Sequence, residues 1–181
     1  MTPDETVVQS GVGHADDLDR LWTPHRMAYI RGENKPADAT SGECPFCRIP
    51  SLPDDEGLVV GRGETAYAVL NLYPYAPGHL MVCPYRHIAD YTDTTVDEAA
   101  EIAAMTKAAM RTLRTVSRAE GFNAGMNQGA AGGAGIAAHL HQHVVPRWVG
   151  DQNFMPVIGH TKTLPQLLQD TRRLLADCWS D

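Results

Sequence analysis

The sequence predicts an α+β fold, with an antiparallel sheet, one long helix and a further helix at the C-terminus. Short apolar segments bounded by glycine and proline are typical of antiparallel strands, and they occupy residues 58–60, 66–70, 79–83 and 122–127. Residues 95–119 instead repeat apolar side chains at steps of three and four, as one face of a helix does. Strands and helices do not alternate regularly, which argues against a parallel sheet.

The first 43 residues differ in character from the rest of the chain. Residues 1–15 are polar and lack periodicity, which predicts a disordered N-terminus. Residues 16–43 are predicted to form an arm and a loop, and Pro24 can occupy the first turn of a short helix over residues 24–31. Apolar side chains such as Trp22 are expected to pack this arm on the body of the protein or on a partner.

Turn and cap residues separate the later elements. Residues 61–65 suit a hairpin turn, and two prolines and a glycine impose a loop on residues 71–78. Thr95 and Glu98 have the spacing of a capping box, which marks the start of the long helix. Gly121 is expected to end that helix. Towards the C-terminus, a loop over residues 146–163 precedes helical spacing over residues 164–179.

Composition limits the location and the partners of the protein. The chain has 181 residues and a net charge of −7, which argues against a broad nucleic-acid surface. No apolar run reaches the length of a membrane span and no signal pattern opens the chain, so a cytoplasmic protein is expected. In that compartment the Cys44–Cys47 pair indicates a metal or redox site rather than a structural disulfide. Cys83 lies in an apolar run and is expected to be buried.

Three histidines alternate with other residues at positions 139, 141 and 143. On a strand, alternate side chains share one face, so the three imidazoles are expected to lie on one side of the sheet. Ordinary polar residues and a metal-binding tract are the alternative interpretations. As chemistry, the three rings offer a nucleophile, a phosphate donor and a metal ligand within reach of one another.

Three segments together resemble the histidine-triad (HIT) superfamily. The stretch His139-Leu-His141-Gln-His143-Val-Val is similar to the family motif. Residues 69–87 resemble its Asn-Pro-Gly-His-strand-Pro-His pattern, and Asn127-Gln-Gly129 resembles its Asn-x-Gly. The resemblance implies a HIT-like antiparallel sheet over residues 44–150. Residues 151–181 would then be an extension that packs on the domain or on a partner subunit, and a homodimer or larger homo-oligomer is expected.

The resemblance also implies roles for individual residues. His141 would attack the α-phosphorus of an adenine nucleotide and form a nucleotidyl-histidine, and His143 would donate to the phosphate oxygens. Asn71 would bind the ribose, although a turn-forming asparagine is the simpler interpretation. Asn127 and the loop segment Gly133-Ala134-Gly135 would hold phosphate oxygens, although a flexible hairpin loop explains the glycines equally well. Arg147 is expected to be solvated rather than to clamp phosphate.

The resemblance also implies a metal site, because many bacterial members of the superfamily bind a structural zinc ion. Carried over to this sequence, the ligands would be Cys44, Cys47, His87 and His139. Two thiolates and two imidazoles suit tetrahedral zinc with no open position, and no redox cofactor is implied. The alternative is a reduced cysteine pair beside ordinary histidines.

The loop before the histidines bears on the reaction. Hydrolytic members carry Gly-Gln-Ser or Gly-Gln-Thr there, whereas this chain has Gly133-Ala134-Gly135 and one additional residue before His139. This departure resembles dinucleoside tetraphosphate phosphorylases, in which inorganic phosphate takes the nucleotidyl group and diadenosine tetraphosphate yields ATP and ADP. A HIT-type hydrolase of dinucleoside polyphosphates or phosphoramidates is the first alternative. A non-catalytic nucleotide-binding or zinc-scaffold protein is the second.

Overall fold

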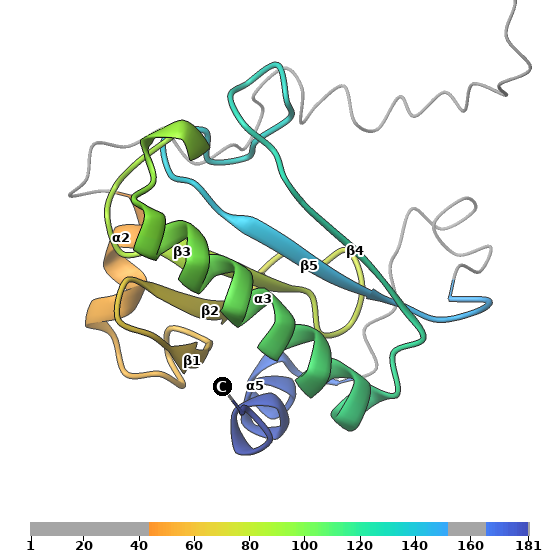
Figure 1. Ribbon diagram of the computed structural model, residues 1–181. Helices are drawn as coiled ribbons and strands as arrows, with labels where there is room; N and C mark the ends of the chain where they lie inside the picture. Colours follow the sequence, from red (N-terminus) through yellow and green to blue (C-terminus); the bar gives the residue numbers. More distant parts are fainter. Residues whose placement is uncertain (1–43, 152–165, 181) are drawn as a thin grey trace, which may run out of the picture. The chain divides into compact units, whose positions relative to one another are not determined.

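The computed structural model describes residues 44–151 and 166–180. The predicted disordered N-terminus, the arm and the start of the C-terminal extension lie outside this range. Among the described residues, five strands form one antiparallel sheet in the order β1-β2-β3-β5-β4. The predicted α+β class is confirmed (Figure 1). Within the same residues, no helix is both long and apolar enough to cross a membrane.

The strands lie close to the predicted segments. They span β1 Val59–Arg62, β2 Ala66–Leu70, β3 Leu80–Pro84, β4 Gly121–Met126 and β5 Gln142–Arg147. β2 has the predicted bounds, whereas β1 and β3 begin one residue later than expected. Leu58 has a φ of 57°, outside the extended region, so β1 begins after it.

The long helix α3, Val96–Ser117, begins as predicted. The Thr95 side chain accepts from the backbone N–H of Glu98, and the Glu98 carboxylate accepts from the backbone N–H of Thr95, which completes the capping box. The expected stop at Gly121 was wrong. The helix ends at Arg118, which adopts a left-handed φ of 54°, while Gly121 already pairs with Arg147 in the sheet.

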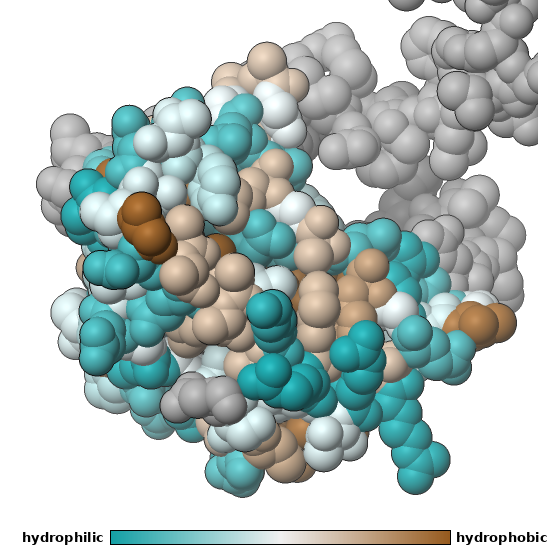
Figure 2. Space-filling view, in the orientation of Figure 1, coloured by the Kyte–Doolittle hydropathy of each residue, from teal (hydrophilic) through white to brown (hydrophobic). Residues whose placement is uncertain are grey.

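α3 covers one face of the sheet, and α5 (Leu168–Asp177) lies beside β1 and α3 (Figure 1). Ile102 and Met105 of α3 pack with Ala68 of β2 and Val82 of β3, so even-numbered residues of these strands point to α3. Figure 2 shows strongly hydrophilic residues over the C-terminal half of α3, as expected for the solvent side of an amphipathic helix.

Odd-numbered strand residues point to the opposite face. Cross-strand pairing aligns four of them in a row: Val69, Met81, His143 and Gly125. Helix α2 (Pro45–Arg48) lies on this side, because the Tyr67 hydroxyl of β2 donates to the Phe46 carbonyl at 2.7 Å. The short 3-10 turns η2 (Ile49–Ser51) and η3 (Tyr91–Asp93) follow α2 and precede α3. The sheet thus presents His143 on the face that α3 leaves uncovered.

Of the three alternating histidines, only His143 lies in a strand, so the predicted strand assignment of positions 139 and 141 was wrong. The register that pairs Val82 with Gln142 would place Pro84 opposite Leu140. Pro84 has no N–H with which to extend the ladder. The backbone N–H of Leu140 donates instead to the Ile88 carbonyl at 2.6 Å. The segment before β5 is therefore held by loop contacts and side chains.

Candidate active site

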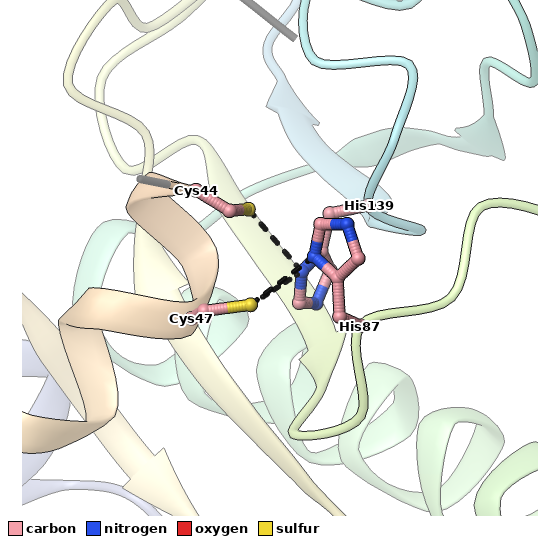
Figure 3. A group of neighbouring side chains, drawn as sticks. All are labelled: Cys44, Cys47, His87 and His139. Carbon is pink, nitrogen blue, oxygen red and sulfur yellow. Dashed lines mark hydrogen bonds between the residues drawn. The ribbon is translucent and has the colours of Figure 1, made fainter. Parts of the chain in front are cut away.

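Four potential metal ligands converge beside α2. Cys44 caps the helix, Cys47 lies within it, His87 follows β3 and His139 precedes β5. Their ligand atoms all lie within 4.8 Å of one another. Both thiols point towards the imidazoles in Figure 3, with the Sγ of Cys47 3.2 Å from His87 Nδ1 and 3.5 Å from His139 Nδ1. The Sγ of Cys44 lies 3.4 Å from His139 Nδ1. The sequence-predicted ligand set is thus brought together in space.

The donor set and its spacing fit a tetrahedral ion. Zinc–sulfur and zinc–nitrogen bonds of about 2.0–2.3 Å correspond to ligand–ligand separations of about 3.3–3.8 Å, close to the three sulfur–nitrogen distances of 3.2, 3.4 and 3.5 Å. His139 Nε2 lies 2.9 Å from the Pro84 carbonyl and donates to it, which leaves Nδ1 unprotonated towards the cysteines. Burial lowers the pKa of His139 to about 4, so its ring is neutral at pH 7. Burial, with the neighbouring Cys44 adding to it, raises the pKa of Cys47 to about 11. Forming the thiolate that binds a metal is therefore unfavourable by itself, and a divalent cation would offset that cost.

His141 is buried at the other side of the same segment. Its Nδ1 lies 2.8 Å from the His139 carbonyl oxygen and donates to it, so the lone pair of the neutral ring is on Nε2. The Phe46 ring packs against it with centroids 4.9 Å apart. Burial lowers the pKa of His141, which keeps the ring neutral at pH 7. A neutral imidazole with a fixed tautomer is suited to act as a nucleophile.

His143 is coupled to a fourth histidine, His79, which is fully buried at the end of the loop before β3. His79 Nε2 lies 2.9 Å from His143 Nδ1. The backbone N–H of Tyr75 donates to His79 Nδ1 at 3.1 Å, and the side-chain Nδ2 of Asn71 lies 3.3 Å from the same nitrogen. The rings of His141 and His143 are 4.9 Å apart at 82°, so the predicted nucleophile and the predicted phosphate donor are neighbours.

Among the predicted substrate-binding residues, Asn71 contacts the histidine cluster through His79. The Asn71 carbonyl oxygen accepts from the Tyr73 N–H at 2.9 Å, so the turn-forming role also occurs. The N–H groups of Gly133 and Ala134 donate within their own loop, to Ala130 at 3.1 Å and to Gly129 at 3.3 Å. A role of these two N–H groups in phosphate binding, like those of Gly135 and the half-buried Asn127, stays a prediction.

Arg147 is engaged by neighbouring side chains. It donates to the Asp151 carboxylate at 2.6 and 2.9 Å and to the Asn123 side chain at 2.9 Å. This pairing lowers the pKa of Asp151 to about 2. Arg147 is therefore paired with neighbouring side chains rather than simply solvated, and its exclusion as a phosphate clamp stays a prediction.

Sequence reasoning missed Phe46, Tyr75 and His79 as site residues. Phe46 lies between the two cysteines, and its ring contacts both His139 and His141. His79 was assigned to a strand and given no role in the site. It lies 64 residues before His143, so no local pattern in the sequence indicates their hydrogen bond. The pairing of Met81 with His143 brings the two rings together, so the strand register, with the Gly-His of the family pattern, was the signal that could have indicated His79.

Comparison with known proteins gives a consistent result. The HIT domain family matches residues 54–149, a range that includes His87 and the three alternating histidines but begins after the two cysteines. A Mycobacterium tuberculosis protein named AP-4-A phosphorylase is 53% identical over 99% of this chain and 93% of its own length. An Arabidopsis thaliana protein named bifunctional bis(5'-adenosyl)-triphosphatase/adenylylsulfatase FHIT is 33% identical over 48% of this chain and 47% of its own.

Solved structures share the fold. The crystal structure of a Zn-bound histidine triad family protein from Mycobacterium smegmatis superposes with a TM-score of 0.62 and 30% identity, covering 77% of this chain and 94% of that one. The crystal structure of a hypothetical histidine triad nucleotide-binding protein from Sulfolobus tokodaii gives a TM-score of 0.61 and 26% identity, covering 75% of this chain and 91% of that one.

Proposed function

The chain belongs to the HIT domain family, and from this premise we propose that it is a nucleotidyltransferase that splits diadenosine tetraphosphate with inorganic phosphate into ATP and ADP. The observation that carries the proposal is the near full-length similarity to a protein named AP-4-A phosphorylase. The neutral, oriented His141 supplies the nucleophile that such a reaction needs.

The proposed reaction has two displacements. His141 Nε2 attacks the α-phosphorus, a nitrogen–phosphorus bond forms, the bond to the bridging oxygen breaks, and ATP leaves. An oxygen of inorganic phosphate then attacks the same phosphorus, breaks the nitrogen–phosphorus bond and forms ADP. Throughout, the His139 carbonyl holds the Nδ1 proton of His141 and stabilises the imidazolium that develops. His143, with its proton on Nε2, donates to the phosphate oxygens as their charge increases.

We propose zinc as the ion held by Cys44, Cys47, His87 and His139. The two-sulfur, two-nitrogen donor set supports this choice, as does the Zn-bound relative. Four protein ligands leave no open position, so the ion would supply cross-linking of α2 to the segments after β3 and before β5. His141 and His143 would carry the chemistry.

The cellular setting follows from the same considerations. We propose a cytoplasmic location, which the four free cysteines support because a reducing compartment keeps thiols unpaired. A homodimer or larger homo-oligomer is proposed on family resemblance, and light scattering of the purified protein tests it. Adenine nucleotide and inorganic phosphate are the proposed small-molecule partners.

The decisive experiment follows labelled inorganic phosphate. Diadenosine tetraphosphate is incubated with the protein and [³²P]phosphate, and ATP, ADP and AMP are separated. We expect equal amounts of ATP and ADP, with the label in the β-phosphate of ADP. His141→Asn should lower the rate by roughly 10⁴ or more, because it removes the nucleophile.

The same experiment tests the alternatives. AMP and ATP that form whether or not phosphate is present would indicate a hydrolase, which the Arabidopsis relative named as a triphosphatase favours. Equal rates for wild type and His141→Asn would contradict a covalent mechanism. Nucleotide binding without turnover in either protein would support the non-catalytic alternative.

A further inference from the structure

The Tyr75 ring lies over the paired imidazoles of His79 and His143. Its centroid is 4.8 Å from that of His79 and 5.9 Å from that of His143, with interplanar angles of 31° and 34°. The two imidazoles are 5.1 Å apart, so the three rings form one cluster. Tyr75 is 53% exposed whereas His79 is fully buried. The tyrosine therefore lies on the solvent side of His79 and partly covers His143, which is half-buried.

The backbone of Tyr75 determines where the protons of this pair lie. Its N–H can only donate, so His79 Nδ1 must accept. In a neutral His79 the proton is then on Nε2, which donates to His143 Nδ1 across 2.9 Å. A neutral His143 in turn carries its proton on Nε2. The Tyr75 N–H, with the Asn71 side-chain NH2 as a second donor to the same nitrogen, thus sets the tautomers of two rings.

A positive charge on His143 is incompatible with this arrangement. Protonation would place an N–H on Nδ1, opposite the N–H of His79 Nε2. His79 cannot relieve the conflict by moving its proton to Nδ1, because the Tyr75 N–H occupies that position. Burial and the charge of a protonated His141 act in the same direction and hold the pKa of His143 at about 4.

The other neighbours of His143 do not offset this effect. Its partners in the sheet are Met81 on β3 and Gly125 on β4, neither of which titrates. His141 on its own segment and His79 and Tyr75 from the loop before β3 are the titratable groups whose rings contact it among the described residues. Access of water to the pair is therefore a remaining variable, and the Tyr75 ring is in contact with both imidazoles.

We propose that Tyr75 is a positioning residue for nucleotidyl transfer: its N–H fixes the proton arrangement of the His79–His143 pair, and its ring shields the pair from water. His143 then meets the phosphate oxygens as an uncharged donor with its proton on Nε2. The kinetic consequence rests on the proposed function, whereas the protonation of the resting protein does not. Removing the ring should hydrate the pair and favour the charged form of His143.

The test is an NMR titration of the histidine ring nitrogens in the full-length protein. Tyr75→Ala is compared with wild type, with Tyr75→Phe, which keeps the ring, and with Tyr73→Ala, which removes an aromatic ring that is 78% exposed in the same loop. We expect Tyr75→Ala to raise the pKa of His143 by about one unit towards its ordinary value. Tyr75→Phe and Tyr73→Ala should titrate as wild type. Tyr75→Ser provides a second ring deletion if the alanine variant aggregates.

Kinetics provide the second readout. At pH 7 we expect Tyr75→Ala to reduce kcat for phosphorolysis about tenfold, whereas Tyr75→Phe should keep the kcat of wild type. An unchanged His143 titration in the ring deletions would overturn the inference, as would an equal shift in Tyr73→Ala. If wild type shows no phosphorolysis, the proposed function fails, and the titration still decides the role of Tyr75.

Discussion

At the scale of single residues, the backbone governs the protonation of the site. His139 donates from Nε2 to the Pro84 carbonyl, His141 donates from Nδ1 to the His139 carbonyl, and His79 accepts from the Tyr75 N–H. Each contact leaves the other ring nitrogen with a defined role. The alternation of the histidines in sequence predicts that they act together. It does not predict which nitrogen faces which partner, because Pro84, Tyr75 and His79 come from distant parts of the chain.

The depressed pKa of His143 predicts a pH dependence of stability. Its folded-state pKa is about 4 against an ordinary value of 6.5, so below about pH 6.5 the unfolded chain takes up a proton that the folded protein does not. The free energy of unfolding should therefore be fully retained above about pH 6.5 and decrease as the pH falls towards 4. Urea titrations across this range measure it.

His143→Gln is the matched variant, because it removes this group and leaves the other titrating groups in place. Its free energy of unfolding should depend less on pH between 6.5 and 4 than that of wild type. If the free energy of unfolding changes equally with pH in the two proteins, the assignment of the effect to His143 is wrong.

At the scale of elements, the start of α3 is the best predicted feature. Thr95 and Glu98 are three residues apart, so their reciprocal hydrogen bonds are readable from the sequence. The structure adds Arg86, whose guanidinium donates to the Glu98 carboxylate at 2.6 and 2.7 Å. This ion pair, with burial opposing it, lowers the pKa of Glu98 to about 2. Arg86 follows β3, twelve residues earlier, and no local pattern indicates that contact.

Removal of the cap should measurably weaken the protein. Thr95→Ala removes the acceptor for the Glu98 N–H and should lower the free energy of unfolding by about 1 kcal/mol. Thr115→Ala is the control, because that hydroxyl donates to the Arg111 carbonyl on the exposed surface of the same helix. Chemical denaturation of both variants checks the difference, and equal losses would mean that the capping hydrogen bond contributes nothing.

At the scale of the whole molecule, the candidate metal centre joins segments that are far apart in sequence. Cys44 and Cys47 come from α2, His87 from the chain after β3, and His139 from the chain before β5. The family resemblance predicts this ligand set, whereas the residues alone predict only the cysteine pair. Phe46 lies between the cysteines and packs on His141, so the centre also positions an aromatic ring on the proposed nucleophile.

Loss of one thiolate should remove the metal and loosen α2. We expect Cys44→Ser to abolish zinc binding, measured as metal content of the purified protein, and to lower the melting temperature by several degrees. Cys178→Ser is the matched control, because that thiol is exposed and lies outside the cluster. If Cys44→Ser retains a full equivalent of zinc, the four-residue assignment is wrong.

The sequence separation within this cluster has a consequence for folding kinetics. Cys44 and His139 are 95 positions apart, so we expect all four ligands to meet only after β5 has joined β3. An ion bound by all four ligands would therefore bind late in folding, after most of the native strand pairing has formed. Interactions absent from the folding transition state act mainly on the reverse rate. Metal should accordingly slow unfolding while the rate of folding stays nearly unchanged, so the centre would contribute kinetic stability to the folded protein.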